Sequence, residues 1–249
     1  MKKWPLVACV LFSPVLFTNV ASATQNTQID SFSKAKRLLM KNVYNKTDMR
    51  NTVYCGAKFD EKKQVTLPQG FNDSLYTSRS KRVEFEHIVP AENFGRAFKE
   101  WREGDAQCVS SKGKAYKGRK CANKANYEYR LMQADGYNLF AAIGSVNAYR
   151  SNYNFQMMSG TQSDFGSCDF HVEDRKAQPP QQARGLIART YLYFDATYSQ
   201  FRLSKQQKQL FTAWDKQYPV SAFECQKAEI VKSYQHNSNP ILEERCAAL

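Results

Sequence analysis

A glutamate and a histidine stand side by side near the end of a short alternating segment. Residues 82–90 read RVEFEHIVP, in which Glu86 is followed at once by His87, one of only three histidines in the chain. A carboxylate is a hard oxygen ligand for Mg²⁺, and a histidine changes its charge near neutral pH. Metal-assisted cleavage of a phosphodiester uses both kinds of group, although either residue alone is more often structural.

A run of asparagines among aromatic residues is the second candidate group. Residues 137–155 read YNLFAAIGSVNAYRSNYNF and include Asn138 and Asn147. A carboxamide oxygen suits Mg²⁺, because this ion keeps several of its waters and needs few protein ligands. Asparagines also gather in turns and caps, so the run is an indication and not a metal site in itself.

The charge of the chain favours a polyanionic partner. It has 36 Lys and Arg against 23 Asp and Glu, a net charge of +13. Such a balance suits nucleic acid, and it suits an anionic membrane surface or the cell envelope equally well. Charge says nothing about catalysis, so a nucleic-acid-binding protein without activity and an envelope-binding protein are alternatives to a nuclease.

Residues 1–23 have the pattern of a signal peptide. Two lysines precede an apolar stretch that closes with Ala21, Ser22 and Ala23. A membrane anchor is the alternative, but prolines interrupt the stretch and it is short for a bilayer. We therefore expect a protein exported to the periplasm or beyond, whose mature part is residues 24–249. Removing two lysines and no acids leaves 34 basic and 23 acidic residues, a net charge of +11.

Cysteine usage agrees with export. Cys9 lies in the predicted signal peptide, and the six others are Cys55, Cys108, Cys121, Cys168, Cys225 and Cys246. An even number in an exported chain predicts three disulfides, for which spacing leaves fifteen pairings open. Zinc is the competing interpretation, but no two cysteines have C-x2-C spacing and the other histidines, His171 and His236, are isolated.

The elements that would position the Glu86–His87 pair raise a geometric problem. Alternation predicts a strand over residues 83–89 that Pro90 ends. Neighbours on a regular strand point to opposite faces, so both side chains reach one site only where the strand ends or twists. The nearby Pro90 favours such an ending, and a helix with Phe94, Phe98 and Trp101 on one side should follow.

The surrounding elements are predicted to be mostly helical. Apolar residues at helical spacing predict a helix over residues 32–43, capped by Ser31 or Ser33. Helices in the C-terminal third are predicted with caps at Ser204 and Ser221. Residues 103–125 lose the apolar signal and gain lysines, so a basic loop is expected there, either simply solvated or lying against a phosphate backbone.

Six sequence blocks carry a resemblance to a known family. In chain order they read RVEFEHIVPAENFG, GRKC, RLMQADGYNL, IGSVNAYRSNYNF, ARGLIARTYLYF and LSKQQKQLFTAWDKQYPV. They resemble the bacterial periplasmic or secreted endonuclease I family, which includes the Vibrio extracellular nucleases, over about residues 32–246. The resemblance implies an α+β fold with a ββα-metal nuclease core and a mostly helical surround, in a single compact domain stapled by disulfides.

The resemblance also implies an activity. Members of the family cleave DNA, and often RNA, with little sequence preference and with Mg²⁺, for which Mn²⁺ or Ca²⁺ could stand in. By motif, Glu86 and Asn147 would hold the metal, His87 would be the general base and Arg119 would contact the phosphate. Hydrolysis of this kind should leave 5′ phosphates. We expect a monomer that binds nucleic acid and no membrane.

Further site residues follow from the same alignment of motifs. Lys117 and Lys120 flank Arg119 and are expected to bind nucleic acid, while Gln133 and Asn138 are expected to support the site. Gln133 stands where relatives have Glu, Tyr137 replaces a His, and the residues around Asn147 are altered at Ser145, Ala148 and Tyr149. These departures favour the alternative of a catalytically impaired nucleic-acid-binding protein of the same fold.

The resemblance finally suggests a disulfide pairing. Ala57 stands where relatives carry an additional cysteine, and that cysteine's usual partner is missing as well. The order of the remaining cysteines then pairs Cys55 with Cys168, Cys108 with Cys121, and Cys225 with Cys246.

Overall fold

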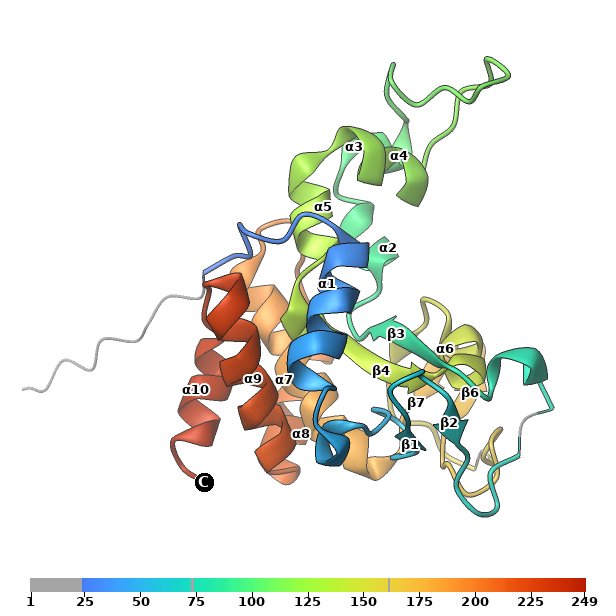
Figure 1. The fold of residues 1–249 in the computed structure, drawn as a ribbon, viewed down its shortest axis with the longest axis vertical. Helices are drawn as coiled ribbons and strands as arrows, with labels where there is room; N and C mark the ends of the chain where they lie inside the picture. Colours follow the sequence, from blue (N-terminus) through green and yellow to red (C-terminus); the bar gives the residue numbers. More distant parts are fainter. Residues whose placement is uncertain (1–23, 73, 161) are drawn as a thin grey trace, which may run out of the picture.

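A two-stranded antiparallel sheet and the helix that follows it lie at the centre of the fold (Figure 1). The structure is a computed structural model that describes residues 24–72, 74–160 and 162–249. The predicted signal peptide, residues 1–23, lies outside the described residues. Strand β3 (Val83–His87) pairs with β4 (Leu139–Ile143), with His87 opposite Leu139. All five residues of β4 are buried, which explains its uninterrupted apolar sequence.

Helix α6 (Gly144–Arg150) begins directly after β4 and packs on the strand pair. Gly144 is required for this close start. A Cβ at this position would lie 2.5 Å from the main-chain oxygen of Arg79 and 3.1 Å from Oε1 of Glu84. Only a residue without a side chain lets α6 approach β3 so closely, and this brings the side chains of α6 next to those of β3.

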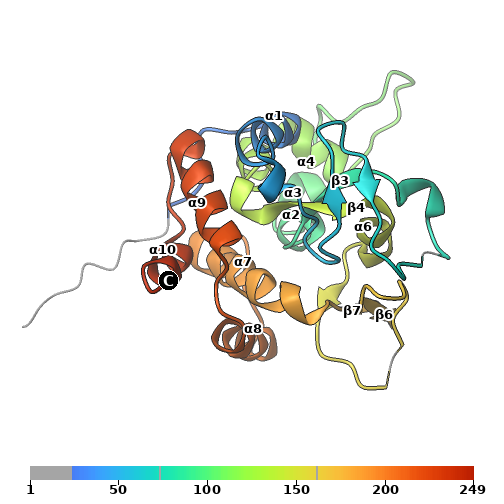
Figure 2. The same ribbon diagram turned by 60° about the horizontal axis from the view of Figure 1, so that its bottom comes forward.

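Helices cover the sheet on one side. Figures 1 and 2 show α7, α8, α9 and α10 gathered on the side of the molecule away from β6 and β7. The bounds are α7 (Arg184–Thr197), α8 (Lys205–Gln217), α9 (Ala222–Gln235) and α10 (Pro240–Cys246). The buried guanidinium of Arg189 on α7 joins three of them, because it donates to Asp215 of α8 and Glu224 of α9 at 3.1 and 2.8 Å.

Several predicted helices are confirmed, together with their caps. Helix α1 (Phe32–Leu38) continues as a π-helical turn (Leu39–Val43), and the side chain of Ser31 accepts from the first turn. Ser204 and Ser221 both form capping boxes, with Gln207 and Glu224 as the reciprocal partners. These signals are local in the chain, which is why they could be recognised in the sequence.

The short elements complete the domain. They are β1 (Lys58–Phe59) with β2 (Val65–Thr66), a three-stranded sheet in the order β5 (Asn154–Phe155), β7 (Lys176–Gln178) and β6 (His171–Glu173), and the helices α2 (Ala91–Gly95), α3 (Lys99–Arg102), α4 (Arg119–Ala125) and α5 (Tyr127–Gln133). Single turns of 3₁₀ helix lie at Thr47–Met49, Thr77–Arg79, Gly136–Asn138 and Gln181–Ala183.

Two predictions about the segment between Pro90 and Ala125 are wrong. The expected loop over residues 103–125 ends earlier, because Arg119–Ala125 forms α4 with Cys121 and Ala122 fully buried. The basic residues on the exposed side of α4 outnumber its buried residues, so the sequence pattern did not predict a helix there. The single helix expected after Pro90 is divided into α2 and α3. The chain turns between them so that the ring of Trp101 packs directly on Gly95, where even a Cβ would come within 2.3 Å.

The three predicted disulfides are confirmed. Cys55 pairs with Cys168, Cys108 with Cys121, and Cys225 with Cys246. The second bridge closes the basic loop onto α4, and this loop stands out from the body beyond α3 and α4 in Figure 1. The prediction of a single compact α+β domain stapled by disulfides is therefore confirmed. Within the described ranges, no helix combines the length and the apolar character that a membrane span needs.

Candidate active site

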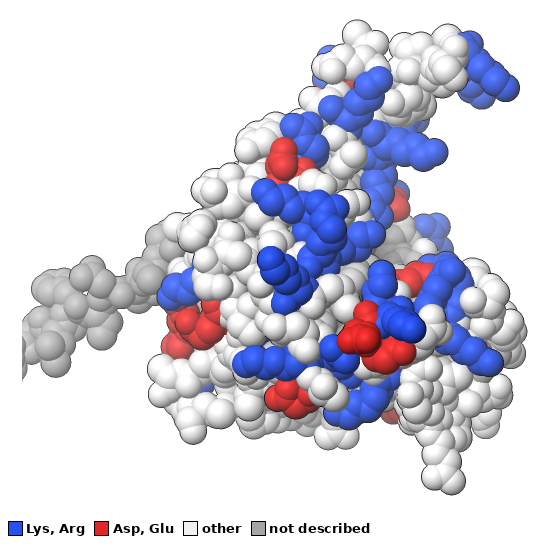
Figure 3. All heavy atoms as spheres, viewed as in Figure 1, with Lys and Arg blue, Asp and Glu red and all other residues white. Residues whose placement is uncertain are grey.

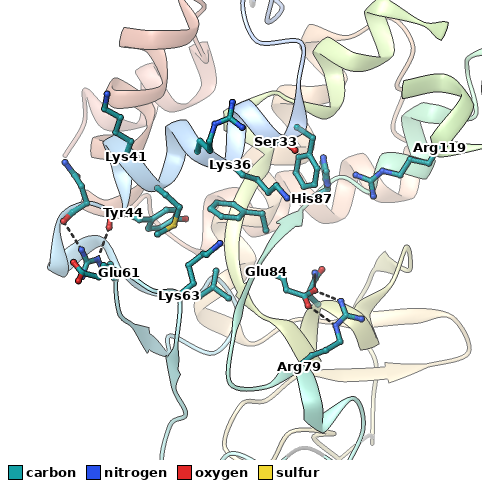
Figure 4. Close-up of a pocket in the computed structure, with 18 residues that line it drawn as sticks. Ser33, Lys36, Lys41, Tyr44, Glu61, Lys63, Arg79, Glu84, His87 and Arg119 are labelled. Carbon is teal, nitrogen blue, oxygen red and sulfur yellow. Dashed lines mark hydrogen bonds and ion pairs between the residues drawn. The ribbon is translucent and has the colours of Figure 1, made fainter. Parts of the chain in front are cut away.

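A cavity of about 1150 Å³ lies between α1 and the face of β3 (Figure 4). Its charge is mostly positive, with seven basic side chains against two acidic ones. The basic side chains are Lys36, Arg37, Lys41, Arg50, Lys63, Arg79 and Arg119, and the acidic ones are Glu61 and Glu84. In Figure 3, lysines and arginines gather over the face that α1 crosses and continue toward α3 and α4. This cavity would attract a polyanion.

A second cavity of about 400 Å³ adjoins the first. Its walls include Glu86, Trp101 and Asn152, and it shares Phe85, His87 and Arg119 with the larger cavity. The imidazole and the guanidinium therefore lie at the junction of the two cavities. Figure 4 shows the side chain of Arg119 reaching toward His87 from α4.

The His87 imidazole is held as a neutral base. Its Nε2 lies 2.8 Å from the main-chain oxygen of Gln133. A carbonyl oxygen can only accept, so we assign the ring proton to Nε2, which leaves Nδ1 as the basic nitrogen. Burial, together with the positive charge of Arg119, lowers the pKa of His87 to about 3. The ring is thus neutral at physiological pH and can accept a proton at Nδ1.

Gln133 and Asn138 both contact the segment that carries His87. The side-chain amide of Gln133 turns away and donates to Asn123, so the bond to His87 comes from its main chain. In this protein the main chain of Gln133, and not its side chain, therefore holds the imidazole of His87. The side chain of Asn138 bonds both main-chain atoms of Val89, at 2.7 and 3.0 Å, and so fixes the chain where β3 ends.

Glu86 is buried in an ion pair, with 4% of the residue exposed. Its Oε1 accepts from the hydroxyl of Tyr54 and from Nη1 of Arg150, both at 2.7 Å. The fully buried Arg150 also donates to the main-chain oxygens of His87 and Ile88, at 2.8 and 2.6 Å. Burial raises the pKa of Glu86, and the charge of Arg150 opposes the rise. Hydrogen bonds from Tyr54, from Arg150 and from the main chain of His87 also favour the charged carboxylate.

Asn147 forms a hydrogen bond with the carboxylate of Glu84 and not with that of Glu86. Its Nδ2 donates to Oε2 of Glu84 at 3.1 Å, and Oε1 of Glu84 accepts from Arg79 at 2.9 Å. Burial alone would raise the pKa of Glu84, but the hydrogen bonds from Arg79 and Asn147 outweigh it and the pKa is lowered. Because Nδ2 is occupied, Oδ1 of Asn147 is the atom that remains to bind a ligand.

The structure thus places each predicted ligand in a cavity that His87 also lines, but the two ligands line different cavities. Asn147 lines the larger cavity with Glu84, and Glu86 lines the smaller one. Sequence reasoning missed Glu84. Alternation gave no signal for it, because residues two apart on a strand should share a face, whereas Glu84 and Glu86 line different cavities. The partner of Glu84, Asn147, is 63 residues away in the chain.

Of the three basic residues predicted to bind nucleic acid, only Arg119 lines the site. It is exposed at the first position of α4, with its guanidinium 5.4 Å from the centre of the Phe32 ring. Lys117 and Lys120 are exposed, but they line neither of the two cavities.

The donor chemistry of the site fits Mg²⁺. Glu86 and Asn147 carry the kind of oxygen donor that Mg²⁺ prefers, and this ion is commonly bound by one or two carboxylates together with water. Both oxygens of Glu84 already accept hydrogen bonds, from Arg79, Arg82 and Asn147. A zinc site would need three or four protein ligands, mostly the nitrogen of His or the sulfur of Cys. Over residues 24–249, positions 73 and 161 aside, no group of three or more His, Cys, Asp or Glu is arranged to hold a metal ion.

The fold and the site define a disulfide-stapled α+β domain whose basic cavity holds a buried neutral imidazole and oxygen donors, as a hydrolase of anionic substrates would need. A family model described as Endonuclease I matches residues 18–246. The chain therefore belongs to the endonuclease I family, and the resemblance seen in the sequence blocks is confirmed.

Relatives match over nearly the whole chain. An extracellular deoxyribonuclease of Aeromonas hydrophila is 35% identical, covering 95% of this chain and 100% of the relative. A periplasmic deoxyribonuclease of the same species is 36% identical over 91% of each chain. Endonuclease-1 of Buchnera aphidicola from Acyrthosiphon pisum is 29% identical over 92% of this chain and 87% of the relative.

Proposed function

We propose that this protein is an exported, Mg²⁺-dependent endonuclease that hydrolyses the phosphodiester bonds of DNA, and of RNA, without sequence preference and leaves 5′ phosphates. The observation that carries the proposal is the His87 imidazole, which is neutral and whose Nδ1 has no hydrogen-bond partner among the described residues. It lies at the junction of two cavities that also hold Arg119 and the oxygen donors. The names of the relatives, extracellular and periplasmic deoxyribonucleases, support DNA as a substrate and a location in the periplasm or outside the cell.

The proposed mechanism is an in-line hydrolysis. Nδ1 of His87 takes a proton from a water molecule as the water oxygen forms a bond to phosphorus. Arg119 donates charge-assisted hydrogen bonds to a non-bridging oxygen and so orients the phosphate. A Mg²⁺ ion held by Glu86 and Asn147 would offset the negative charge that develops on the phosphate and on the leaving 3′ oxygen. The bond between phosphorus and that oxygen breaks, and the oxygen takes a proton from solvent.

Cleavage of plasmid DNA by the purified mature protein tests the proposal. We expect nicking and then degradation with Mg²⁺, and no cleavage in EDTA. Products should become labelled by a polynucleotide kinase only after phosphatase treatment, which identifies 5′ phosphates. Cleavage that persists in EDTA would contradict the metal role, and the same assay with RNA decides the second substrate.

The alternative is a nucleic-acid-binding protein that has lost activity. The observation that favours it is the set of substitutions at Gln133, Tyr137 and around Asn147. Tyr137 is buried away from both cavities, where its hydroxyl donates to the main-chain oxygen of Asn237 at 2.9 Å. A pure binder would retard plasmid DNA in a gel without cutting it in any divalent ion, so the same experiment separates the two functions.

Glu84 gives rise to a further prediction, because its carboxylate orients Asn147. Glu84→Ala should release the Asn147 side chain and lower activity about 10–100-fold, as is typical for a residue that orients a metal ligand. The Mg²⁺ concentration for half-maximal activity should rise as well. Glu61→Ala is the matched control, since it removes an equal charge from the same cavity without a contact to Asn147. Equal effects of the two substitutions would show that Glu84 contributes only charge.

A further inference from the structure

A third cavity, of about 390 Å³, adjoins the cavity that contains Glu86 and His87. Three arginines, Arg96, Arg175 and Arg202, line it, and Glu92 is its one acidic residue. The cavity shares Glu92 and Asn152 with the cavity that contains Glu86 and His87. The three cavities therefore adjoin one another in a series, with His87 and Arg119 between the first and the second.

The single carboxylate in this cavity is already neutralised. Glu92 accepts hydrogen bonds from Arg96 on one oxygen and from the side-chain amide of Asn152 on the other. It therefore does not oppose the binding of an anion as a free carboxylate would. The remaining charge of the cavity is that of Arg175 and Arg202.

Arg202 has the geometry of a prepared anion receptor. Its Nη1 donates to three main-chain oxygens, those of Asp195, Tyr198 and Phe201, at 3.0, 2.8 and 2.8 Å. These bonds hold the guanidinium in place, while Nε and Nη2 have no partner among the described residues. A guanidinium with two free donors binds a phosphate in bidentate fashion, and prior orientation lowers the entropy lost on binding.

Arg175 lies at the tip of the turn between β6 and β7. It adopts a positive φ of 60°, is exposed, and forms no ion pair with any of the described acidic residues. Its position on a turn means that its replacement should not disturb the packed core. A substitution of Arg175 should therefore change the binding of nucleic acid without changing the stability of the fold.

We propose that Arg175 and Arg202 form a second phosphate subsite, which holds the sugar–phosphate backbone of the substrate at a distance from the bond that is cut. The inference rests on the proposed function, because it concerns how far a nucleic-acid substrate extends beyond the catalytic cavities. A polynucleotide long enough to reach this subsite is bound more tightly than one that fills only the cavities around His87.

Binding and cleavage of DNA of two lengths test the subsite. With a duplex of several helical turns, Arg175→Gln should reduce the slope of log affinity against log salt by about 1, the change expected for one lost phosphate contact. The ratio kcat/KM should fall several-fold on this duplex and stay unchanged on an oligonucleotide of a few nucleotides. Lys216→Gln is the matched control, because Lys216 is also exposed but lies on α8 and lines none of the three cavities.

Two results would overturn the proposed subsite. Equal changes in salt slope for Arg175→Gln and Lys216→Gln would mean a general effect of net charge and would overturn the subsite. An equal loss of kcat/KM on long and short substrates would overturn it too. The salt slope is measured in EDTA without cleavage, so it decides the subsite even if the unsubstituted protein fails to cut DNA, which would contradict only the proposed function.

Discussion

His87→Ala should lower the rate of DNA cleavage by about 10²–10⁴-fold and leave DNA affinity unchanged, because it removes the base that accepts the proton but none of the basic side chains of the cavity. Single-turnover cleavage and a binding titration measure the two effects separately. His236→Asn is the control for loss of a histidine. His236 is exposed and ends α9 in the left-handed conformation, which Asn tolerates. Near-full activity of His87→Ala would remove this residue from the mechanism.

The pH dependence follows from the lowered pKa of His87. Only the neutral imidazole can accept a proton, and the pKa of about 3 keeps it neutral as the pH falls from 8 to 5. The pH profile of kcat/KM, which reports groups of the free enzyme, should therefore show no loss centred near 6.5, the usual pKa of histidine. A loss of kcat/KM at that pH that disappears in His87→Ala would contradict the buried, neutral state of the imidazole.

Glu86→Ala should lower the free energy of unfolding by about 3–5 kcal/mol, the usual cost of leaving a buried charge without its partner. The charge left behind is that of Arg150, which is fully buried and pairs with Glu86 at 2.7 Å. Activity should be lost as well if Glu86 holds the metal. Denaturation in urea measures the first effect, and cleavage at rising Mg²⁺ concentration measures the second.

A double substitution separates the structural role of Glu86 from its chemical role. Glu86→Leu combined with Arg150→Met replaces the ion pair by apolar side chains of similar size and should recover part of the lost stability. Activity should stay lost, because the carboxylate is still absent. Recovery of activity in the double variant would show that Glu86 serves only to neutralise Arg150 and does not hold the metal.

Helix boundaries were predictable where their signals are local. The caps at Ser31, Ser204 and Ser221 depend on residues within one turn, and all three are present. Helix α4 was missed, since its short apolar side consists of little more than Cys121 and Ala122 between lysines. Disulfide pairing is not local, because Cys55 and Cys168 are 113 residues apart. It could be predicted only through the resemblance to a family.

The sequence alone determined that a carboxylate and an imidazole are adjacent at a strand end, that the chain is strongly basic, and that its blocks match a nuclease family. Only the tertiary structure decided what each side chain contacts. Arg150 lies 64 residues from Glu86 and binds it, Asn147 lies 63 residues from Glu84, and the Gln133 carbonyl that sets the His87 tautomer lies 46 residues away. The physical reason is that alternation along a strand specifies the face of a side chain, whereas its partner depends on how distant segments pack against that face.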